Sequence, residues 1–218
     1  SFTARKGETI AFIGSTGSGK STIVNLILRL YDVTEGSIRV DGVDVRDYTQ
    51  RALRRKIGYV PQRPVLFSGT VASNVAYGDT AAERTLEDVK RAVAIAQAAD
   101  FVEAMEGGYE ASISQGGINI SGGQKQRLSI ARAICRRPEI YIFDDSFSAL
   151  DYRTDRLLRS ALKKETAGVT SIIVAQRVGT IMDADRIVVL DSGMVVGIGR
   201  HSELLGTCPV YREIVNSQ

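Results

Sequence analysis

A run of glycine, hydroxyl and lysine residues near the start of the chain has the composition of a phosphate-binding loop. Gly14 to Thr22 reads G-S-T-G-S-G-K-S-T and fits the pattern G-x-x-x-x-G-K-[ST]. Glycines let the backbone approach phosphate closely, so that successive N–H groups can bind its oxygen atoms. Lys20 can reach the β- and γ-phosphates of a nucleotide, and the Ser21 hydroxyl can ligate Mg²⁺. The predicted nucleotide-binding residues are Gly14, Ser15, Thr16, Gly17, Ser18, Gly19, Lys20, Ser21 and Thr22.

The segments on either side of this loop supply the context that the pattern requires. Thr9 to Ile13 is a short apolar run rich in β-formers, which predicts a buried strand, and Thr22 to Leu30 has apolar residues at helical spacing. The start of such a helix adds the positive end of its dipole to the loop. An ordinary glycine-rich turn is the competing interpretation. The combination of loop, strand and helix favours binding of a nucleoside triphosphate.

An acidic pair follows a second apolar run. Ile140 to Phe143 predicts a strand, and Asp144 and Asp145 come directly after it. Ligands bind at the carboxyl ends of strands in open α/β sheets, and an Asp in this place holds Mg²⁺ in phosphate-loop enzymes. We therefore predict that Asp144 ligates the metal and that Asp145 orients or deprotonates the attacking water. The competing interpretation is that the pair caps a helix that begins near Thr154.

Composition limits the class of protein. The chain has 218 residues, of which 44% are hydrophobic and 24% are charged, a balance typical of one globular domain. No apolar run approaches the roughly 20 residues of a membrane span, and no signal peptide is visible. The net charge of +3 is too small to indicate a nucleic-acid partner. Cys135 and Cys208 are far apart and lack metal-ligand spacing, which favours reduced thiols. Ser1 to Glu8 enters the first strand with little lead-in, and we expect an N-terminally truncated domain.

The order of predicted elements indicates an α/β fold. Strands alternate with helices in the first and last thirds of the chain, which predicts a mostly parallel sheet, and hairpins around Asp41-Gly42 and before Met194 predict an antiparallel portion. The middle third is helical, with one long helix expected from Glu83 to Ala99 and a shorter one from Asp100 to Glu106. We predict a P-loop NTPase (RecA-like) core at about 1–70 and 137–218, with an inserted α-helical subdomain at about 71–136.

Further motifs give the chain a family resemblance over almost its whole length. The motifs are Ile120-Ser121-Gly122-Gly123-Gln124, Tyr59-Val60-Pro61-Gln62, the strand Ile140 to Asp144, Ser148-Ala149-Leu150-Asp151, and Leu66 to Val71 with Asn74 and Tyr77-Gly78. With them the chain resembles the nucleotide-binding domain of an ATP-binding cassette (ABC) transporter of the exporter type. In that family they correspond, in the same order, to the signature L-S-G-G-Q, the Q-loop, the Walker B strand, the D-loop and the exporter segment.

The resemblance implies a division of roles. Ser21, Gln62 and Asp144 would hold Mg²⁺, Gln62 would also contact the nucleotide, and Asp151 would belong to the D-loop. In the family two such domains pair head to tail, and each signature covers the γ-phosphate on the other domain's P-loop. Here Ser121, Gly122, Gly123 and Gln124 would serve that second site at the start of a helix. A plain helix cap would explain Ser121 but not the Gly-Gly-Gln that follows. The exporter segment near Leu66–Gly78 would meet the coupling helices of a transmembrane domain, at the cytoplasmic face of a membrane.

Four positions depart from the family pattern. Asp145 stands where Glu is usual as catalytic base, and Gln176 stands where the switch histidine is expected; the chain's single histidine is His201. Gln115 replaces a Glu, and the aromatic residue that stacks on adenine would lie upstream of Ser1. A misplacement of about 1 Å can cost about 10² in rate, and loss of a preorganised polar contact costs about 10²–10³. Because Lys20, Ser21, Gln62 and Asp144 are present, we expect the chain to bind ATP. We expect it to hydrolyse ATP weakly, because the catalytic positions hold Asp145 and Gln176, as in the degenerate-site half of a heterodimeric exporter.

Other functions remain open from the sequence. They are a soluble ABC-type ATPase that acts on DNA or the ribosome, a nucleotide-binding regulatory module without turnover, and an importer cassette. The exporter segment and the roughly 60 residues between Q-loop and signature disfavour the first and the last. The transported substrate cannot be read from this chain.

Overall fold

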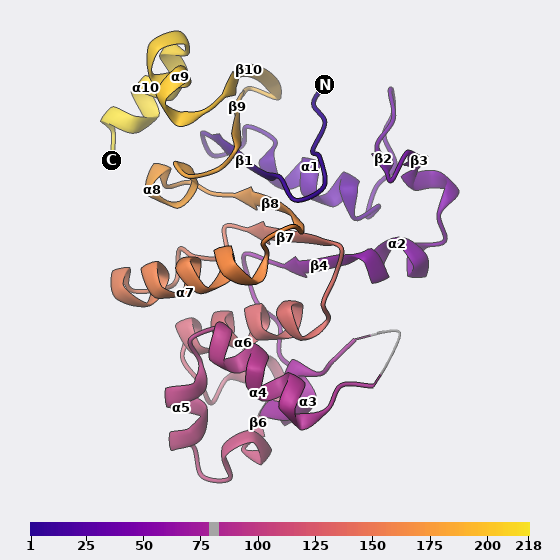
Figure 1. The fold of residues 1–218 in the computed structure, drawn as a ribbon, viewed down its shortest axis with the longest axis vertical. Coiled ribbons are helices and arrows are strands. Elements are labelled where there is room, and N and C mark those ends of the chain that lie inside the picture. The colour runs from indigo at the N-terminus through magenta and orange to yellow at the C-terminus, as the bar shows by residue number, and fades with distance from the viewer. Residues whose placement is uncertain (79–82) are drawn as a thin grey trace. The chain divides into compact units, whose positions relative to one another are not determined.

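The structure is a computed structural model, and it describes residues 1–78 and 83–218 (Figure 1). Residues 79–82, inside the predicted helical subdomain, lie outside the described range. The chain forms two compact units. The first contains Ser1–Ile57, Ile140–Asp145 and Gly168–Gln218, and the second contains Gly58–Glu139 and Ser146–Ala167. Their bounds differ from the expected division near residues 70 and 137, because the strand and turn at 58–70 and the segment 146–167 group with the helical middle.

The first unit is built on a sheet in which β10, β9, β1, β8 and β7 lie side by side in that order (Figure 1). β1 pairs in parallel with β8 and β9, β7 pairs in parallel with β8, and β10 pairs antiparallel with β9. The strands are β1 (Thr9–Gly14), β7 (Ile140–Asp144), β8 (Thr170–Val174), β9 (Arg186–Asp191) and β10 (Met194–Gly199). The prediction of a mostly parallel α/β sheet with an antiparallel portion is confirmed.

The interiors of the parallel strands are mostly apolar, as is typical of parallel sheets that pack against helices. In β1 every residue after Thr9 is buried. On one face, α8, α9 and α10 contribute to a buried cluster that includes Ile13, Val178, Leu204 and Tyr211. These helices are α8 (Val178–Ile181), α9 (His201–Thr207) and α10 (Pro209–Asn216), and the sequence analysis predicted none of them.

The remaining elements of the first unit follow β1. The helix α1 (Lys20–Ile27) packs against β1 and β7. It starts before the predicted Thr22 and ends before the predicted Leu30, because Arg29 takes a positive φ of 51° that stops the helix. β2 (Arg39–Val40) and β3 (Val43–Asp44) form the predicted hairpin, and Asp41 and Gly42 both have positive φ, as a two-residue hairpin turn requires. A 3₁₀ turn η1 (Val45–Asp47) and α2 (Gln50–Lys56) come next, and Ile57 begins β4 (Ile57–Val60).

The second unit is mainly helical. Its helices are α3 (Val71–Val75), α4 (Leu86–Ile95), α5 (Ala99–Ala104), α6 (Gly122–Cys135) and α7 (Tyr152–Glu165). Short strands β5 (Gly69–Thr70) and β6 (Ser112–Ile113) pair antiparallel, and 3₁₀ turns η2 (Gly108–Glu110) and η3 (Gln115–Gly117) lie beside β6 in the sequence.

The prediction of one long helix from Glu83 to Ala99 is wrong. α4 begins only at Leu86, because Thr85 and Asp88 form a capping box there. It ends at Ile95, and Gln97 then takes a positive φ of 54° before α5 starts. The N–H of Ala98 bonds to the carbonyl of Val93 across this break, so the end of α4 is satisfied by a left-handed cap.

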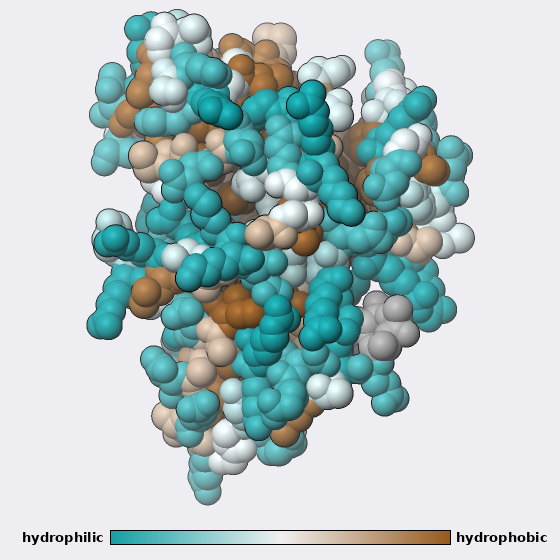
Figure 2. Space-filling view, viewed as in Figure 1, coloured by the Kyte–Doolittle hydropathy of each residue, from teal (hydrophilic) through white to brown (hydrophobic). Residues whose placement is uncertain are grey.

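Hydrophilic side chains cover most of the face shown in Figure 2. Among the described residues, no helix is both long and apolar enough to cross a membrane.

Candidate functional site

The phosphate-loop motif lies where β1 ends and α1 begins, in the first unit. Gly14 is the last residue of β1, and a Cβ at this position would lie 2.1 Å from the Leu190 carbonyl oxygen and 2.6 Å from Ser18 Oγ. Only glycine therefore fits between the loop and β9. Gly19, the N-cap of α1, has a φ of 98°, which also requires glycine. Ser15, Thr16 and Gly17 are exposed, and so are Ser21 and Thr22 at the start of the helix.

Lys20 is held by the loop itself. Its Nζ donates to the carbonyl oxygens of Gly14 (2.8 Å) and Ser15 (2.7 Å) and lies 3.3 Å from Ser18 Oγ. The side chain thus folds back over the loop, with its ammonium near the backbone that a phosphate tail would follow. Burial lowers the pKa of Lys20, while the negative charges of Asp145 and Asp144 act in the opposite direction. The structure therefore brings the loop lysine and both members of the acidic pair into one electrostatic site.

The acidic pair lies at the carboxyl end of β7. Asp144 is buried, and its Cα pairs with Val174 at the end of β8. Asp145 has a positive φ of 45°, a conformation that Asp adopts more readily than most residues, and its N–H donates to the Val174 carbonyl at 2.8 Å. The competing interpretation, that the pair caps the helix near Thr154, is wrong: α7 begins at Tyr152 and its N-cap is Asp151.

Gln176 contacts Asp145 directly. It lies two residues beyond the end of β8, and its Nε2 donates to Asp145 Oδ2 at 2.9 Å. Two of the four positions at which the sequence departs from the family pattern, Asp145 and Gln176, are therefore hydrogen-bonded partners. One oxygen atom of the Asp145 carboxylate therefore accepts a hydrogen bond from the Gln176 amide. An amide N–H donates hydrogen bonds but does not transfer its proton.

The donor set near the loop fits a divalent cation of the Mg²⁺ type. Mg²⁺ prefers hard oxygen ligands, takes only one or two carboxylates, and completes its shell with water and substrate phosphates. Ser21 offers a hydroxyl, and Asp144, at the end of β7, offers a carboxylate on an element that packs against α1. No group of three or more His, Cys, Asp or Glu side chains suited to a metal occurs among residues 1–78 and 83–218.

The signature motif lies in the second unit, at the start of α6. Ser121 is the N-cap, and it forms a capping box with Gln124: the Gln124 N–H donates to Ser121 Oγ at 3.3 Å, and the Ser121 N–H donates to Gln124 Oε1 at 2.8 Å. The argument that a helix cap could not explain Gln124 is therefore wrong. Gly122 is exposed with open space around its Cα, while a Cβ at Gly123 would lie 3.4 Å from the Ala149 carbonyl oxygen.

Gln62 and Asp151 also belong to the second unit. Gln62 is exposed, and the carbonyl of Pro61 beside it accepts a hydrogen bond from Gln126 of α6 at 3.3 Å. Asp151 accepts the Thr154 N–H at 2.9 Å, and hydrogen bonding to Thr154 lowers the pKa of the Asp151 carboxyl. Both motifs are thus anchored at the ends of well-formed elements. Their roles at a nucleotide remain predictions.

The exporter-like segment around Leu66–Gly78 is organised by two polar side chains, the buried Asn74 and the half-buried Arg132. Asn74 accepts the Phe67 N–H at 2.9 Å and donates to the carbonyls of Phe67 (2.9 Å) and Thr70 (3.0 Å). Arg132 of α6 lies over the rings of Phe67 and Tyr77, 5.5 Å from each centroid. Sequence reasoning missed Arg132, because one arginine on a basic helix carries no signal of burial.

Gln115, the third departure from the family pattern, contacts this segment. Its Oε1 accepts hydrogen bonds from Ser68 N (3.3 Å) and Ser68 Oγ (3.2 Å). A carboxylate could make the same two contacts, so the substitution removes a charge without changing which atoms are bound.

Comparison with known proteins agrees with this geometry. The sequence model of the ABC transporter family matches residues 1–148, more than half of the chain. An uncharacterised ABC transporter ATP-binding protein of Mycobacterium tuberculosis is 50% identical over 100% of this chain and 37% of its own length. The human ATP-binding cassette sub-family B member 5 is 41% identical over 100% of this chain and 17% of its own length.

A solved structure shows the same fold. A bacterial Atm1-family ABC exporter with ATP bound is similar at a TM-score of 0.93 and 40% identity, over 97% of this chain and 37% of the exporter. The chain thus spans little more than a third of the length of the bacterial relatives that it matches. The chain belongs to the ABC transporter family, and its fold is that of the family's P-loop NTPase domain.

Proposed function

We propose that this chain is the ATP-binding domain of an ABC exporter, that it binds Mg-ATP at its own P-loop and hydrolyses it slowly there, and that it completes a faster site on a partner domain. The observation that carries the proposal is the hydrogen bond from Gln176 Nε2 to Asp145 Oδ2 (2.9 Å) at the carboxyl ends of β8 and β7.

Binding of ATP is supported by the complete phosphate loop. Gly14 and Gly19 allow the loop to wrap around phosphate, and the first turn of α1 presents N–H groups that no side chain caps. Lys20 Nζ, now bonded to carbonyl oxygens of the loop, can exchange these acceptors for β- and γ-phosphate oxygens. Ser21 and Asp144, with Gln62, would hold Mg²⁺, which neutralises charge on the phosphate tail when bound.

Slow hydrolysis is supported by the Asp145–Gln176 pair. A base must reach the water that attacks the γ-phosphate. The Asp145 side chain is one methylene shorter than the Glu of the family pattern, and one of its oxygen atoms already accepts the Gln176 amide. The amide is neutral and cannot supply the charge that a protonated histidine offers to the transition state. Losses of about 10² for geometry and about 10²–10³ for the missing polar contact need not add, because such groups act as a unit.

A partner domain is supported by the signature. Ser121 to Gln124 opens a helix of 14 residues, and the exposed Gly122 leaves its first turn accessible to an anion. One phosphate tail does not need two such sites in one chain. The signature therefore serves a nucleotide bound by another domain, and in a heterodimer that domain would contain the faster catalytic residues.

The exporter assignment is supported by the segment that Asn74 and Arg132 organise. Val65 and Tyr77 are 53% and 52% exposed on this segment, which suits contact with the coupling helices of a transmembrane domain. The 40% identity to an Atm1-family exporter favours the same assignment. Such a domain works at the cytoplasmic face of a membrane.

The test compares ATP turnover of the wild-type protein with the double variant Asp145→Glu with Gln176→His. We expect kcat to rise about 100-fold or more, while the dissociation constant of a fluorescent ATP analogue stays within about threefold. Lys20→Ala is the control that should weaken nucleotide binding in both backgrounds. Wild-type turnover near 10 s⁻¹, a typical value for an efficient enzyme, that the double variant does not increase would refute the slow-site proposal.

A further inference from the structure

A side chain from the C-terminal segment holds the backbone on both sides of the loop that carries Gln176. Gln218 Oε1 accepts the Val178 N–H at 2.7 Å, and Gln218 Nε2 donates to the Gln176 carbonyl oxygen at 2.6 Å. One carboxamide therefore binds an acceptor and a donor that flank Arg177. This two-point contact fixes the peptide groups of the loop in the way that a strand neighbour would.

The contact supplies what the local sequence lacks. α8 begins at Val178, directly after the loop, and its N-cap Arg177 makes no side-chain cap. The first N–H of α8 is instead satisfied by Gln218, which is 40 residues away in the sequence. An unpaired buried N–H costs about 1–3 kcal/mol, so this acceptor contributes to keeping the start of α8 in place.

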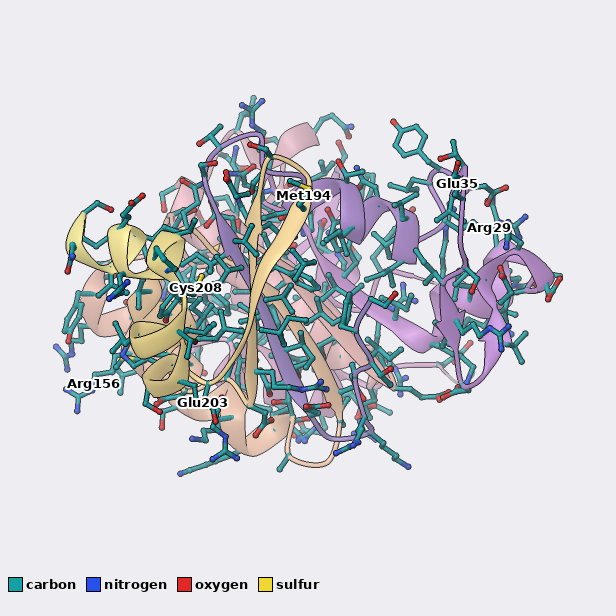
Figure 3. The ribbon with its side chains drawn as sticks, turned by 90° about the horizontal axis from the view of Figure 1, so that it is seen from above. Arg29, Glu35, Arg156, Met194, Glu203 and Cys208 are labelled. Carbon is teal, nitrogen blue, oxygen red and sulfur yellow. The ribbon has the colours of Figure 1, made fainter. Side chains whose placement is uncertain are left out.

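Packing ties the same two segments together independently of the hydrogen bonds. Val178 and Ile181 of α8 belong to one buried cluster with Tyr211 of α10, which is fully buried, and Ile214 and Val215 pack against that cluster. Figure 3 views this part of the chain from above, with Cys208, the residue before α10, among the side chains of the cluster. A shift of α10 would therefore move both Gln218 and the apolar floor of α8.

We propose that Gln218 is a positioning residue for the switch position at 176, and that α10 controls through it how the side chain at 176 meets Asp145. The inference rests on the proposed function, in that the pair 145–176 sets the rate of hydrolysis. The path is short: Gln218 holds the Gln176 backbone at 2.6 Å, and the Gln176 side chain bonds to Asp145 at 2.9 Å. Interface and core packing are bistable rather than softly deformable, so a displaced α10 would release the loop in one step.

The experiment uses the faster background Asp145→Glu with Gln176→His, because the contacts of Gln218 are to the backbone and do not depend on the side chain at 176. Gln218→Ala in that background is expected to lower kcat about 10- to 100-fold with KM for ATP unchanged, since a shift of about 1 Å at a catalytic group costs about 10². Amide hydrogen exchange at Val178 should accelerate in the same variant. Gln218→Glu, which keeps the acceptor but loses the donor, should give an intermediate kcat.

Ser217→Ala is the matched control. Ser217 Oγ donates to the Ile214 carbonyl at 2.8 Å within the same end of α10, so this variant removes a neighbouring hydrogen bond without touching the loop. It should leave kcat and the exchange at Val178 unchanged. An unchanged exchange rate at Val178 in Gln218→Ala, or faster exchange without a fall in kcat, would overturn the positioning role.

The two proposals fail in different ways. If the faster background turns over ATP no better than the wild type, the slow-site proposal fails, and Gln218→Ala is then judged by the same ratio of rates in the wild-type background. If the faster background is active and Gln218→Ala leaves it active, the slow-site proposal stands and Gln218 has no part in it.

Discussion

Replacement of Arg132 offers a sharp measurement on the second unit. Its guanidinium makes three hydrogen bonds: Nε to the Asn74 carbonyl (2.8 Å), Nη1 to the Val65 carbonyl (2.9 Å) and Nη2 to Asn74 Oδ1 (3.1 Å). It also lies over the rings of Phe67 and Tyr77, which pack on each other at 4.5 Å between centroids. Burial lowers the pKa of Arg132, which marks the cost that these contacts must offset.

The magnitude follows from these contacts. Hydrogen bonds to a charged group contribute about 1.5–3 kcal/mol each, and a cation–π contact about 0.5–1 kcal/mol at a partly exposed site. Because one acceptor, on Val65, is solvent-accessible and the contacts share one side chain, we expect Arg132→Leu to lower the free energy of unfolding by about 3–5 kcal/mol rather than by the full sum. Arg132→Lys keeps the charge but cannot form the planar fork, and we expect about half of that loss.

Denaturant unfolding measures both variants. The control is Arg156→Leu: Arg156 lies on the exposed side of α7, where Figure 3 shows its side chain pointing away from the ribbon, and its loss should change the free energy by less than about 0.5 kcal/mol. Hydrogen exchange at Phe67 and Asn74 should report a local loosening in Arg132→Leu. A loss below about 1 kcal/mol, or equal losses in Arg132→Leu and Arg156→Leu, would refute the role assigned to the guanidinium.

Two further predictions concern the first unit. Gly14→Ala places a Cβ 2.1 Å from the Leu190 carbonyl oxygen, so we expect it to lower the free energy of unfolding by about 3 kcal/mol and to weaken ATP binding at least about 100-fold. Gly17→Ala has open space and a φ of 83°, and should lower the free energy of unfolding by about 1–2 kcal/mol. Denaturant unfolding and nucleotide titration measure both variants, and equal effects would contradict the steric argument. The Arg46 side-chain hydrogen bond lowers the pKa of Asp44 to about 2 from 3.8, so the stability that this carboxylate contributes is complete above pH 3.8 and lost as pH falls towards 2. Carboxyl-carbon NMR should show this pKa, and Arg46→Gln should return it towards 3.8; an Asp44 that titrates near 3.8 in the wild type would contradict the contact.

The local parts of the fold could be predicted from the sequence because their signals are local. The phosphate loop has its glycines where backbone contacts require them, and the hairpin at Asp41-Gly42 has the turn residues that positive φ values demand. The apolar runs of β1, β7, β8 and β9 are read correctly because parallel strands in a covered sheet are apolar on both sides. The lengths of two helices are predicted wrongly. Arg29 and Gln97 take positive φ values that end these helices, and neither residue type indicates such a conformation in the sequence.

In the candidate site, too, some residues are predicted well from the sequence and others are not. The sequence predicts Lys20 at the phosphates, Asp144 at the metal and Asp145 at the attacking water, and these roles stay predictions. The structure places both carboxylates where their charges act on the lysine. The signature shows the opposite case, because a motif explained by a ligand also satisfies a local need: Gln124 completes the cap of α6 whether or not a nucleotide is present. A measured loss in Gln124 variants would therefore combine helix stability with any contact to a partner's nucleotide, and the two must be separated by an unfolding measurement.

The switch position shows most clearly why long-range partners escape a reading of the sequence. Gln176 is found from its place between an apolar strand and an arginine, since that pattern is contained in six consecutive residues. Gln218 has no pattern of its own: it follows a short amphipathic helix, and its importance depends on where α10 packs, which is decided by Tyr211 and the cluster around it. The hydrogen bonds from one carboxamide to Gln176 and Val178 then follow from that packing. Asp145 thus contacts a neighbour that the motif predicts, and the backbone of that neighbour is held by a second glutamine that only the tertiary fold reveals.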